Sequence, residues 1–255
     1  MSHTIAVINQ KGGVGKTTTA VNLAAQLAKR GKSVLLIDLD PPGNATSGLG
    51  LDKNNLNGTT YDVLLRQVPL SDAIRGTSLK GLFILATNAD LAAAEVDLVS
   101  RPDREKSLQS AIRPATHDFV IIDCPPALGL LTINGLTAAD SLIIPVQTEY
   151  YALEGLGQLL DTTQRVRNSL NPKLELLGVV LTMYDKRTSL SEQVAGEVRK
   201  HFGEKVFRTV IPRNVKLAEA PSFGKTIFEY DKWSKGAKAY KQFAAEILAK
   251  KEVDL

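Results

Sequence analysis

The hydrophobic residues of the chain gather in short runs, and longer segments of mixed polarity separate these runs. Seven of the runs are rich in β-branched residues, and most are continuous rather than alternating. Continuous apolar runs are typical of strands that are covered on both faces, as in a parallel sheet. The pattern therefore predicts strands at residues 5–8, 34–37, 82–85, 119–122, 142–146, 176–181 and 206–210.

The segments between these runs have the spacing of helices. Residues 15–30 carry one apolar stripe and end on Lys29, Arg30 and Gly31, which suit the last turn and the end of a helix. Residues 235–250 repeat such a stripe, and no internal repeat or long linker divides the chain. The alternation predicts one α/β domain over residues 1–255, with a mostly parallel, twisted sheet of about seven to eight strands flanked by helices on both faces.

Composition narrows the class of protein further. Of the 255 residues, 44% are hydrophobic and 23% charged, and no run approaches the roughly 18 to 20 apolar residues that cross a bilayer. The single cysteine, Cys124, excludes an internal disulfide and a cluster held by several cysteines of one chain. The histidines His3, His117 and His201 lack the spacing of metal ligands. We expect a cytoplasmic protein without redox chemistry.

A glycine-rich loop between the first predicted strand and the first predicted helix carries the strongest chemical signal. Its glycines allow consecutive backbone N–H groups to turn inward, and the helix N-terminus adds a partial positive charge, so a polyphosphate would find a preformed site. We expect Lys16 to reach the terminal phosphates and Thr17 to bind Mg²⁺. The nucleotide-binding residues predicted in this loop are Gly12, Gly13, Val14, Gly15, Lys16, Thr17 and Thr18.

The loop is a variant of the general phosphate-loop pattern. Residue 10 is Gln10, where the general pattern has glycine, and an additional lysine, Lys11, opens the loop. The resulting form is K-G-G-x-G-K-T over residues 11–17.

Three acids follow predicted strands and complete a candidate metal site. Asp123 ends the 119–122 run like a Walker B acid, and we expect it to hold Mg²⁺ directly or through water. Asp38 and Asp40 follow the second strand and point to the same side. We assign Asp38 to the metal and Asp40 to orienting a water for attack on the γ-phosphate. Asp-Pro and Gly-Asn also form turns in any protein, and residues 43–58 form a loop suited to switching.

These motifs resemble those of the ParA/Soj chromosome- and plasmid-partitioning ATPases. The resemblance rests on K-G-G-V-G-K-T at 11–17, D-L-D-P-P-G-N at 38–44 and I-I-D-C-P-P at 121–126. Further similar segments, at 145–155, 181–185 and 210–222, extend it over essentially the whole chain. It implies a P-loop NTPase fold of the deviant Walker A type.

The resemblance also implies roles for individual residues. In this family ATP and Mg²⁺ hold a sandwich dimer, in which Lys11 would reach the partner's nucleotide. The chain would be a weak ATPase that a ParB/Spo0J-type centromere-binding protein stimulates. The absence of an N-K-x-D segment favours ATP over GTP. The implied catalytic residues are Lys11, Lys16 and Asp40, and the implied adenine-binding residues are Met183, Pro212 and Asn214.

Charge is unevenly distributed along the chain. Residues 185–241 hold thirteen Lys or Arg and seven Asp or Glu, a net charge of +6, whereas the rest of the chain is at −2. The family binds DNA non-specifically as ATP dimers, and basic side chains that neutralise phosphates give such binding. The protein would then associate with the nucleoid and not with membranes. The candidate DNA-binding residues are Arg187, Arg199, Lys216, Lys225, Lys235 and Lys238.

Residue 42 departs from the family pattern, which has glutamine where this chain has Pro42. We expect Pro41 and Pro42 to give the switch segment an extended, stiffer start and slower hydrolysis. Three alternatives stay open: a MinD-like ATPase that cycles on membranes, a cluster carrier, which Cys124 alone argues against, and a DNA-binding scaffold without hydrolysis.

Overall fold

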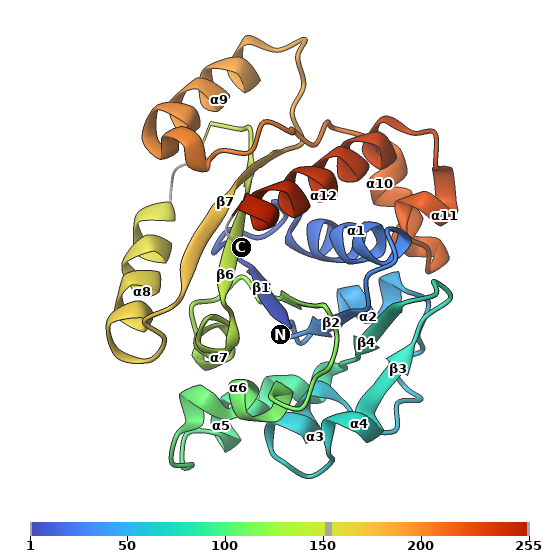
Figure 1. Cartoon of the computed structure of the whole chain (residues 1–255), viewed down its shortest axis with the longest axis vertical. Helices are drawn as coiled ribbons and strands as arrows, with labels where there is room; N and C mark the ends of the chain where they lie inside the picture. Colours follow the sequence, from blue (N-terminus) through green and yellow to red (C-terminus); the bar gives the residue numbers. More distant parts are fainter. Residues whose placement is uncertain (1, 151–154, 254–255) are drawn as a thin grey trace.

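A seven-stranded sheet forms the centre of the protein (Figure 1). The structure is a computed structural model that describes residues 2–150 and 155–253, so Tyr151–Glu154 of the family-like segment and the last two residues lie outside it. The strand order is β3-β4-β2-β5-β1-β6-β7, and all neighbours run parallel except β3 and β4. The strands are β1 His3–Val7, β2 Val34–Asp38, β3 Ile74–Gly76, β4 Leu82–Leu85, β5 Phe119–Asp123, β6 Ser141–Gln147 and β7 Glu175–Thr182.

Six of the seven predicted strands are confirmed, and the prediction for residues 206–210 is wrong. Val206 makes only an isolated bridge to Val179 of β7. The backbone N–H groups of Arg208 and Thr209 instead donate to the Glu246 carboxylate at 2.7 and 2.9 Å. Phe207 and Ile211 donate to the Val179 and Leu181 carbonyls of β7 at 2.9 and 2.8 Å, but the Glu246 side chain takes the Thr209 N–H between them. The pairing is interrupted there, and β7 remains the edge of the sheet.

Helices cover both faces of the sheet, as predicted. One core cluster joins Ile5 and Val7 to the apolar sides of α1 and α12, and the other joins Ala6 and Ile8 to α3, α6, α7, α8 and α9 (Figure 1). The helices are α1 Lys16–Lys29, α2 Asn44–Gly48, α3 Thr60–Leu64, α4 Leu70–Ala73, α5 Ala94–Asp97, α6 Ser107–Ile112, α7 Leu130–Ala138, α8 Leu156–Ser169, α9 Ser189–Phe202, α10 Val215–Glu219, α11 Ile227–Asp231 and α12 Lys235–Val253. Short 3₁₀ turns occur at Ala89–Ala93, Arg104–Lys106, Gly203–Lys205 and Ala220–Phe223 (η4).

The C-terminal helices are tied to the helix that follows the glycine-rich loop. The buried hydroxyls of Thr19 on α1 and Tyr240 on α12 lie 3.1 Å apart. Asn22 of α1 donates to the Thr18 carbonyl and accepts the Ile227 N–H at 2.9 Å. The first turn of α1 and the start of α11 thus share one side chain, which joins the two ends of the sequence in one domain.

A glycine pair brings the segment after α2 against the end of η4. Gly50 and Gly224 both have positive φ, +81° and +60°. A Cβ on Gly224 would lie 2.5 Å from the Gly50 Cα, and a Cβ on Gly50 would lie 3.1 Å from the Gly224 carbonyl oxygen. Only two glycines allow this approach.

Candidate functional site

The predicted site residues meet at the carboxyl ends of three adjacent strands. β1 lies between β5 and β6, and β5 lies between β1 and β2. In this register Asp123 is paired with Val7 on one side and with Asp38 on the other. The carboxyl end of β1 and both acids therefore lie at one level of the sheet. Here the chain leaves β1 toward β2 on one side, and leaves β5 toward β6 on the other. Open α/β sheets bind ligands at such a point.

The glycine-rich loop is held from both flanks. Thr182, the last residue of β7, donates to the Val14 carbonyl at 2.8 Å. Asn9 donates to the Pro145 carbonyl at 2.7 Å and accepts the Lys11 N–H at 3.0 Å. These bonds fix the loop without using the N–H groups at the start of α1, so an anion finds the site formed in advance.

Positive φ angles give the loop its turn into α1. Gly13 has φ +74°, and Gly15, which precedes the helix, has φ +87°. The first helical bond to Gly15 comes from the Thr19 N–H. The N–H groups of Lys16, Thr17 and Thr18 precede that bond and are the donors that helix geometry leaves for an external acceptor.

Lys16 is the buried cation of the site. It is 7% exposed, and its Nζ donates to the Lys11 carbonyl at 3.0 Å. Burial lowers the pKa of Lys16, and the carboxylates of Asp123 and Asp40 oppose this shift. The lysine and the two acids therefore interact, as the sequence predicted for groups around one phosphate chain.

Asp123 is completely buried, and neither carboxylate oxygen has a hydrogen-bond partner among the described residues. Burial, followed by the neighbouring Asp38, raises the pKa of Asp123 well above its ordinary value. The Thr17 side chain offsets a part of this rise in pKa, although its geometry falls short of a hydrogen bond. An unpaired buried carboxylate is costly, and a bound cation would remove that cost.

Asp38 has a second role that sequence reasoning missed. Its Oδ2 accepts the N–H and the hydroxyl of Thr46, both at 2.7 Å, and so anchors α2. The Thr46 hydroxyl in turn accepts the Thr87 N–H at 2.9 Å. Burial raises the pKa of Asp38 to about 6, because these hydrogen bonds offset only a part of the desolvation. An acid eight residues before a threonine gives no signal in the sequence for this contact.

The donor set at this edge fits a hard divalent cation. The side chains of Thr17, Asp38 and Asp123 provide oxygen atoms only, which Mg²⁺ prefers. Across the described ranges, no cluster of three or more His, Cys, Asp or Glu could hold a metal by itself. A cation here would depend on ligand oxygens as well as on the protein.

Asp40 begins a turn, and the prediction of an extended start to this segment is wrong. The Gly43 N–H donates to the Asp40 carbonyl at 2.8 Å, which closes a turn through Pro41 and Pro42. Lys53 donates to the Pro42 carbonyl at 2.7 Å. Burial raises the pKa of the half-buried Asp40, and Lys16 opposes this. The turn needs no N–H from either proline, because its closing hydrogen bond comes from the Gly43 N–H.

The residues predicted to read the base lie on two neighbouring segments. Met183 follows β7 with φ +51°, and Tyr184 bridges Pro212. The Arg213 N–H donates to the Tyr184 carbonyl at 3.0 Å. Within the described residues, the buried Oδ1 of Asn214 has no hydrogen-bond partner, so it can accept from a ligand. The structure thus brings all three predicted residues together, and Thr182 links them to the glycine-rich loop.

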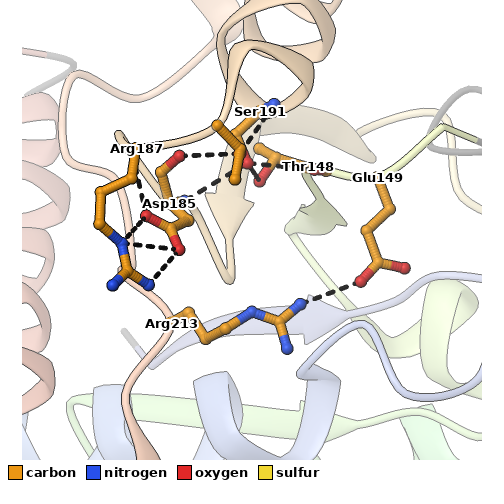
Figure 2. Close-up of polar contacts among 7 residues, drawn as sticks. Thr148, Glu149, Asp185, Arg187, Ser191 and Arg213 are labelled. Carbon is orange, nitrogen blue, oxygen red and sulfur yellow. Dashed lines mark hydrogen bonds and ion pairs between the residues drawn. The ribbon is translucent and has the colours of Figure 1, made fainter.

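A polar network beside these segments was not predicted from the sequence (Figure 2). Arg213 pairs with Glu149 at 3.0 Å, which connects the base-side segment to the end of β6. Arg187 pairs with Asp185 through three contacts of 2.6 to 3.2 Å. Such pairs depend on which surface loops meet, and the sequence gives no spacing rule for that.

The six candidate DNA-binding residues divide into two groups. Arg187 is held by Asp185, and Lys216 is held by Glu219 at 2.9 Å, with the Tyr230 ring 5.5 Å from its Nζ. The others are exposed and form no ion pair in the described part of the chain. These are Arg199, Lys225, Lys235 and Lys238.

Comparisons with known proteins agree with this geometry. A family model described as "AAA domain" matches residues 2–176. The sporulation initiation inhibitor protein Soj of Bacillus subtilis is 53% identical, with 98% of this chain and 99% of Soj covered. The chromosome partitioning protein ParA of Caulobacter vibrioides is 51% identical, with 96% and 94% covered.

A solved structure extends the match to the fold. Cobyrinic acid a,c-diamide synthase from Mycobacterium smegmatis, with bound ADP and magnesium, superposes with a TM-score of 0.89 at 41% identity, covering 100% of this chain and 97% of that one. Motifs, fold and near full-length identity agree: the chain belongs to the ParA/Soj family of chromosome-partitioning ATPases.

Proposed function

We propose that this protein is a Mg²⁺-dependent ATPase that partitions chromosomal or plasmid DNA. ATP binding drives a sandwich dimer that binds DNA non-specifically, and slow hydrolysis to ADP and phosphate releases it. The observation that carries the proposal is the buried Lys16 beside the buried, unpartnered Asp123 at the end of a preformed anion loop. The Soj and ParA relatives support the partitioning role.

The described groups fit ATP at both of its ends. Gly12, Gly13 and Val14 surround the phosphates with backbone, and Lys16 supplies the cation. The unpartnered Asn214 Oδ1 is an acceptor for the exocyclic amine of adenine, beside Met183 and Pro212. The Mycobacterium smegmatis relative carries ADP and magnesium, which supports the same ligands here.

Thr17, Asp38 and Asp123 would hold the magnesium ion. When bound, the ion would neutralise charge on the phosphate oxygens. Asp123, whose buried oxygens have no hydrogen-bond partner among the described residues, would then have a partner, and Asp38 holds α2 through Thr46. The metal site and the 43–58 switch segment thereby share one carboxylate.

Hydrolysis needs a positioned water and a further positive charge. Asp40 lies near enough to Lys16 for their charges to interact, and in the proposed mechanism it orients the attacking water. Lys11 has its backbone fixed on both sides, while its side chain forms no ion pair within the described residues. We assign that side chain to the second subunit's nucleotide, which makes hydrolysis depend on dimerisation. A ParB/Spo0J-type partner would accelerate it.

A MinD-like membrane cycle is less well supported. Tyr240, Phe243 and Ile247 of α12 are buried against the sheet, so the apolar face of the last helix is used in the core. None of the helices in the described part of the chain has the length and apolarity to cross a bilayer.

The decisive experiment measures DNA binding with ATP, ADP or no nucleotide across a salt series. We expect tight binding only with ATP, and an affinity that falls steeply with salt. Lys11→Ala should bind ATP but lose dimerisation and DNA binding, whereas Lys80→Ala, an exposed lysine before β4, should behave as the parent. DNA binding that is equal in all nucleotide states, or a fully active Lys11→Ala protein, would refute the proposal.

A further inference from the structure

Trp233 is the one tryptophan of the sequence, and it is strongly exposed. Its side chain belongs to the turn between α11 and α12 and is 73% accessible to solvent. The turn is ordered: the Trp233 N–H donates to Asp231 Oδ1 at 3.0 Å, and Ser234 caps α12 through the Ala237 N–H at 3.1 Å. The large ring is thus presented to solvent from a fixed backbone.

Exposure of this ring has no explanation in the packing of the domain. The other aromatic side chains of this region have partners: Phe223 stacks on Tyr230 with centroids 5.1 Å apart, Tyr240 and Phe243 pack in the core, and the half-buried Phe228 has the Lys29 Nζ 5.3 Å from its ring centroid. The described residues give Trp233 no ring partner. Trp is the side chain with the largest apolar surface to gain from a ligand.

The surroundings of Trp233 are cationic. The Lys232 Nζ lies 5.3 Å from the ring centroid. Lys235, Lys238 and Lys241 are exposed and recur every three residues on α12, so they share the solvent face of its first turns. Figure 1 shows this end of α12 beside α11, at the side of the molecule that α1 also reaches.

The nearby acids, Glu229 and Asp231, accept hydrogen bonds from neighbouring groups of the protein. Glu229 accepts from the backbone and hydroxyl of Thr226 and from Ser78. Asp231 is used by the Trp233 backbone. Meanwhile the Arg30 guanidinium from the end of α1 donates to the Lys241 carbonyl at 3.0 Å, which adds a further cation to the patch. Proteins that bind single-stranded nucleic acid combine exposed aromatic rings with basic side chains in this way.

We propose that Trp233 stacks on a DNA base while Lys232, Lys235 and Lys238 neutralise the adjacent phosphates, so that this surface prefers single-stranded or locally unpaired DNA to an intact duplex. The preference follows because bases inside a duplex already have stacking neighbours on both sides, and opening a step costs a few kcal/mol. This inference rests on the proposed DNA-binding function and names the form of DNA that the surface favours.

A bilayer is the other acidic surface that tryptophan and lysine can bind. A membrane-bound helix needs a continuous apolar face, and that of α12 is buried through Tyr240, Phe243 and Ile247. A single ring beside three lysines is enough for one base but gives little apolar area for a bilayer. The structure therefore favours nucleic acid.

The test uses the full-length protein, with ATP and without nucleotide, and three polyanions: an oligo-dT strand, a duplex of equal length, and heparin, which has no bases. Because Trp233 is the sole tryptophan, its fluorescence reports on this position alone. We expect oligo-dT to quench it strongly, the duplex weakly and heparin not at all. Trp233→Ala should weaken oligo-dT binding by roughly 5- to 150-fold, the range for one stacked base, without changing the salt slope. Trp233→Phe should restore most of the affinity.

Lys238→Ala serves as the matched control, since it should weaken binding to all three polyanions and reduce the salt slope by about 1. The stacking proposal is overturned if Trp233→Ala binds oligo-dT like the parent, if it loses heparin equally, or if vesicles of phosphatidylglycerol quench the fluorescence and oligo-dT does not. Quenching by oligo-dT that is independent of ATP would keep the stacking and refute the ATP-gated cycle. ATP-gated binding without quenching would refute the stacking alone, and no binding to either DNA would refute both.

Discussion

The two charged regions of this protein are built in opposite ways. At the carboxyl edge of the sheet, Lys16 and Asp123 are buried and act on each other's pKa; the register of adjacent strands fixes Asp123, and Lys16 begins α1. In the basic 185–241 segment, Lys235 and Lys238 are exposed, while others, such as Arg187, are held by local acids. Buried charges need specific partners, whereas exposed charges contribute as a sum. A single substitution should therefore have a large, specific effect in the first region and a small, additive one in the second.

The largest effect should come from Lys16→Ala. Truncating a buried charged partner costs about 2 to 5 kcal/mol, so affinity for MgATP should fall at least roughly 30-fold. Binding of a fluorescent ATP analogue measures this loss, and circular dichroism checks the fold. Lys32→Ala, an exposed lysine just beyond the same helix, should leave the affinity unchanged. Equal losses in the two variants would contradict the distinction between the regions.

The next effect concerns stability without ligand. Because burial raises the pKa of Asp38 from its ordinary 3.8 to about 6, and that of Asp123 also well upward, the folded state favours the protonated acids. The stability that the protonated Asp38 gives to the folded state is fully present below pH 3.8 and is lost as pH rises through about 6. Asp123→Asn should raise the unfolding free energy of the nucleotide-free protein at pH 7 by about 1 to 3 kcal/mol, and should flatten the decline with pH.

Urea unfolding at several pH values measures this stability, and MgATP binding should weaken in the same variant. Asp161→Asn, a change to an exposed acid on α8, should leave both quantities as they are. An Asp123→Asn protein less stable than the parent at pH 7 would mean that the carboxylate has a partner in solution.

Smaller effects are expected among the basic residues. Lys235→Ala should reduce ATP-dependent duplex binding a few-fold and lower the salt slope by about 1. Arg187→Ala and Lys216→Ala should each do less, since Asp185 and Glu219 compete with phosphate for these cations. Titrations at several salt concentrations rank the variants. If Arg187→Ala weakened binding more than Lys235→Ala, internal pairing would not govern this surface.

The smallest effect should be that of Pro42→Gln on ATP turnover. The substitution restores a backbone N–H and a side-chain amide in the turn that follows Asp40, and should raise turnover a few-fold by loosening the switch segment. Phosphate release measures the rate, with Pro102→Gln in an exposed loop as the control. Unchanged turnover would show that the turn, rather than the proline, sets the rate.

Patterns that repeat along the chain made most of the fold predictable. Continuous apolar runs located the strands of the parallel sheet, and the stripe in residues 15–30 located α1. β3 was missed because Ile74–Gly76 has a single apolar residue and pairs only at the sheet edge. The 206–210 run is not a strand because Glu246, far along the chain, accepts the Arg208 and Thr209 N–H groups and interrupts the pairing with β7. Long-range side-chain contacts of this kind leave no periodic signal.

The candidate site also has features that the sequence predicted and features that it did not. The positions of Lys16, Asp38 and Asp123 followed from strand ends and motif spacing, and the structure brings them together. The anchoring of α2 by Asp38 did not follow, because it joins a strand to a helix through a turn of unknown shape. For the surface cations, the sequence indicated the region but could not show which lysines are paired.

The contact between Gly50 and Gly224 limits which substitutions this sequence can accept during evolution. A side chain at position 224 would collide with the Gly50 backbone, one at position 50 would crowd the Gly224 carbonyl, and the positive φ of both positions disfavours any other residue. No compensating change at the second position can make room, since it already carries no side chain. One contact thus requires glycine at both positions, and neither glycine can be replaced before the other. We therefore expect substitutions to be rare where the switch segment meets the C-terminal helices.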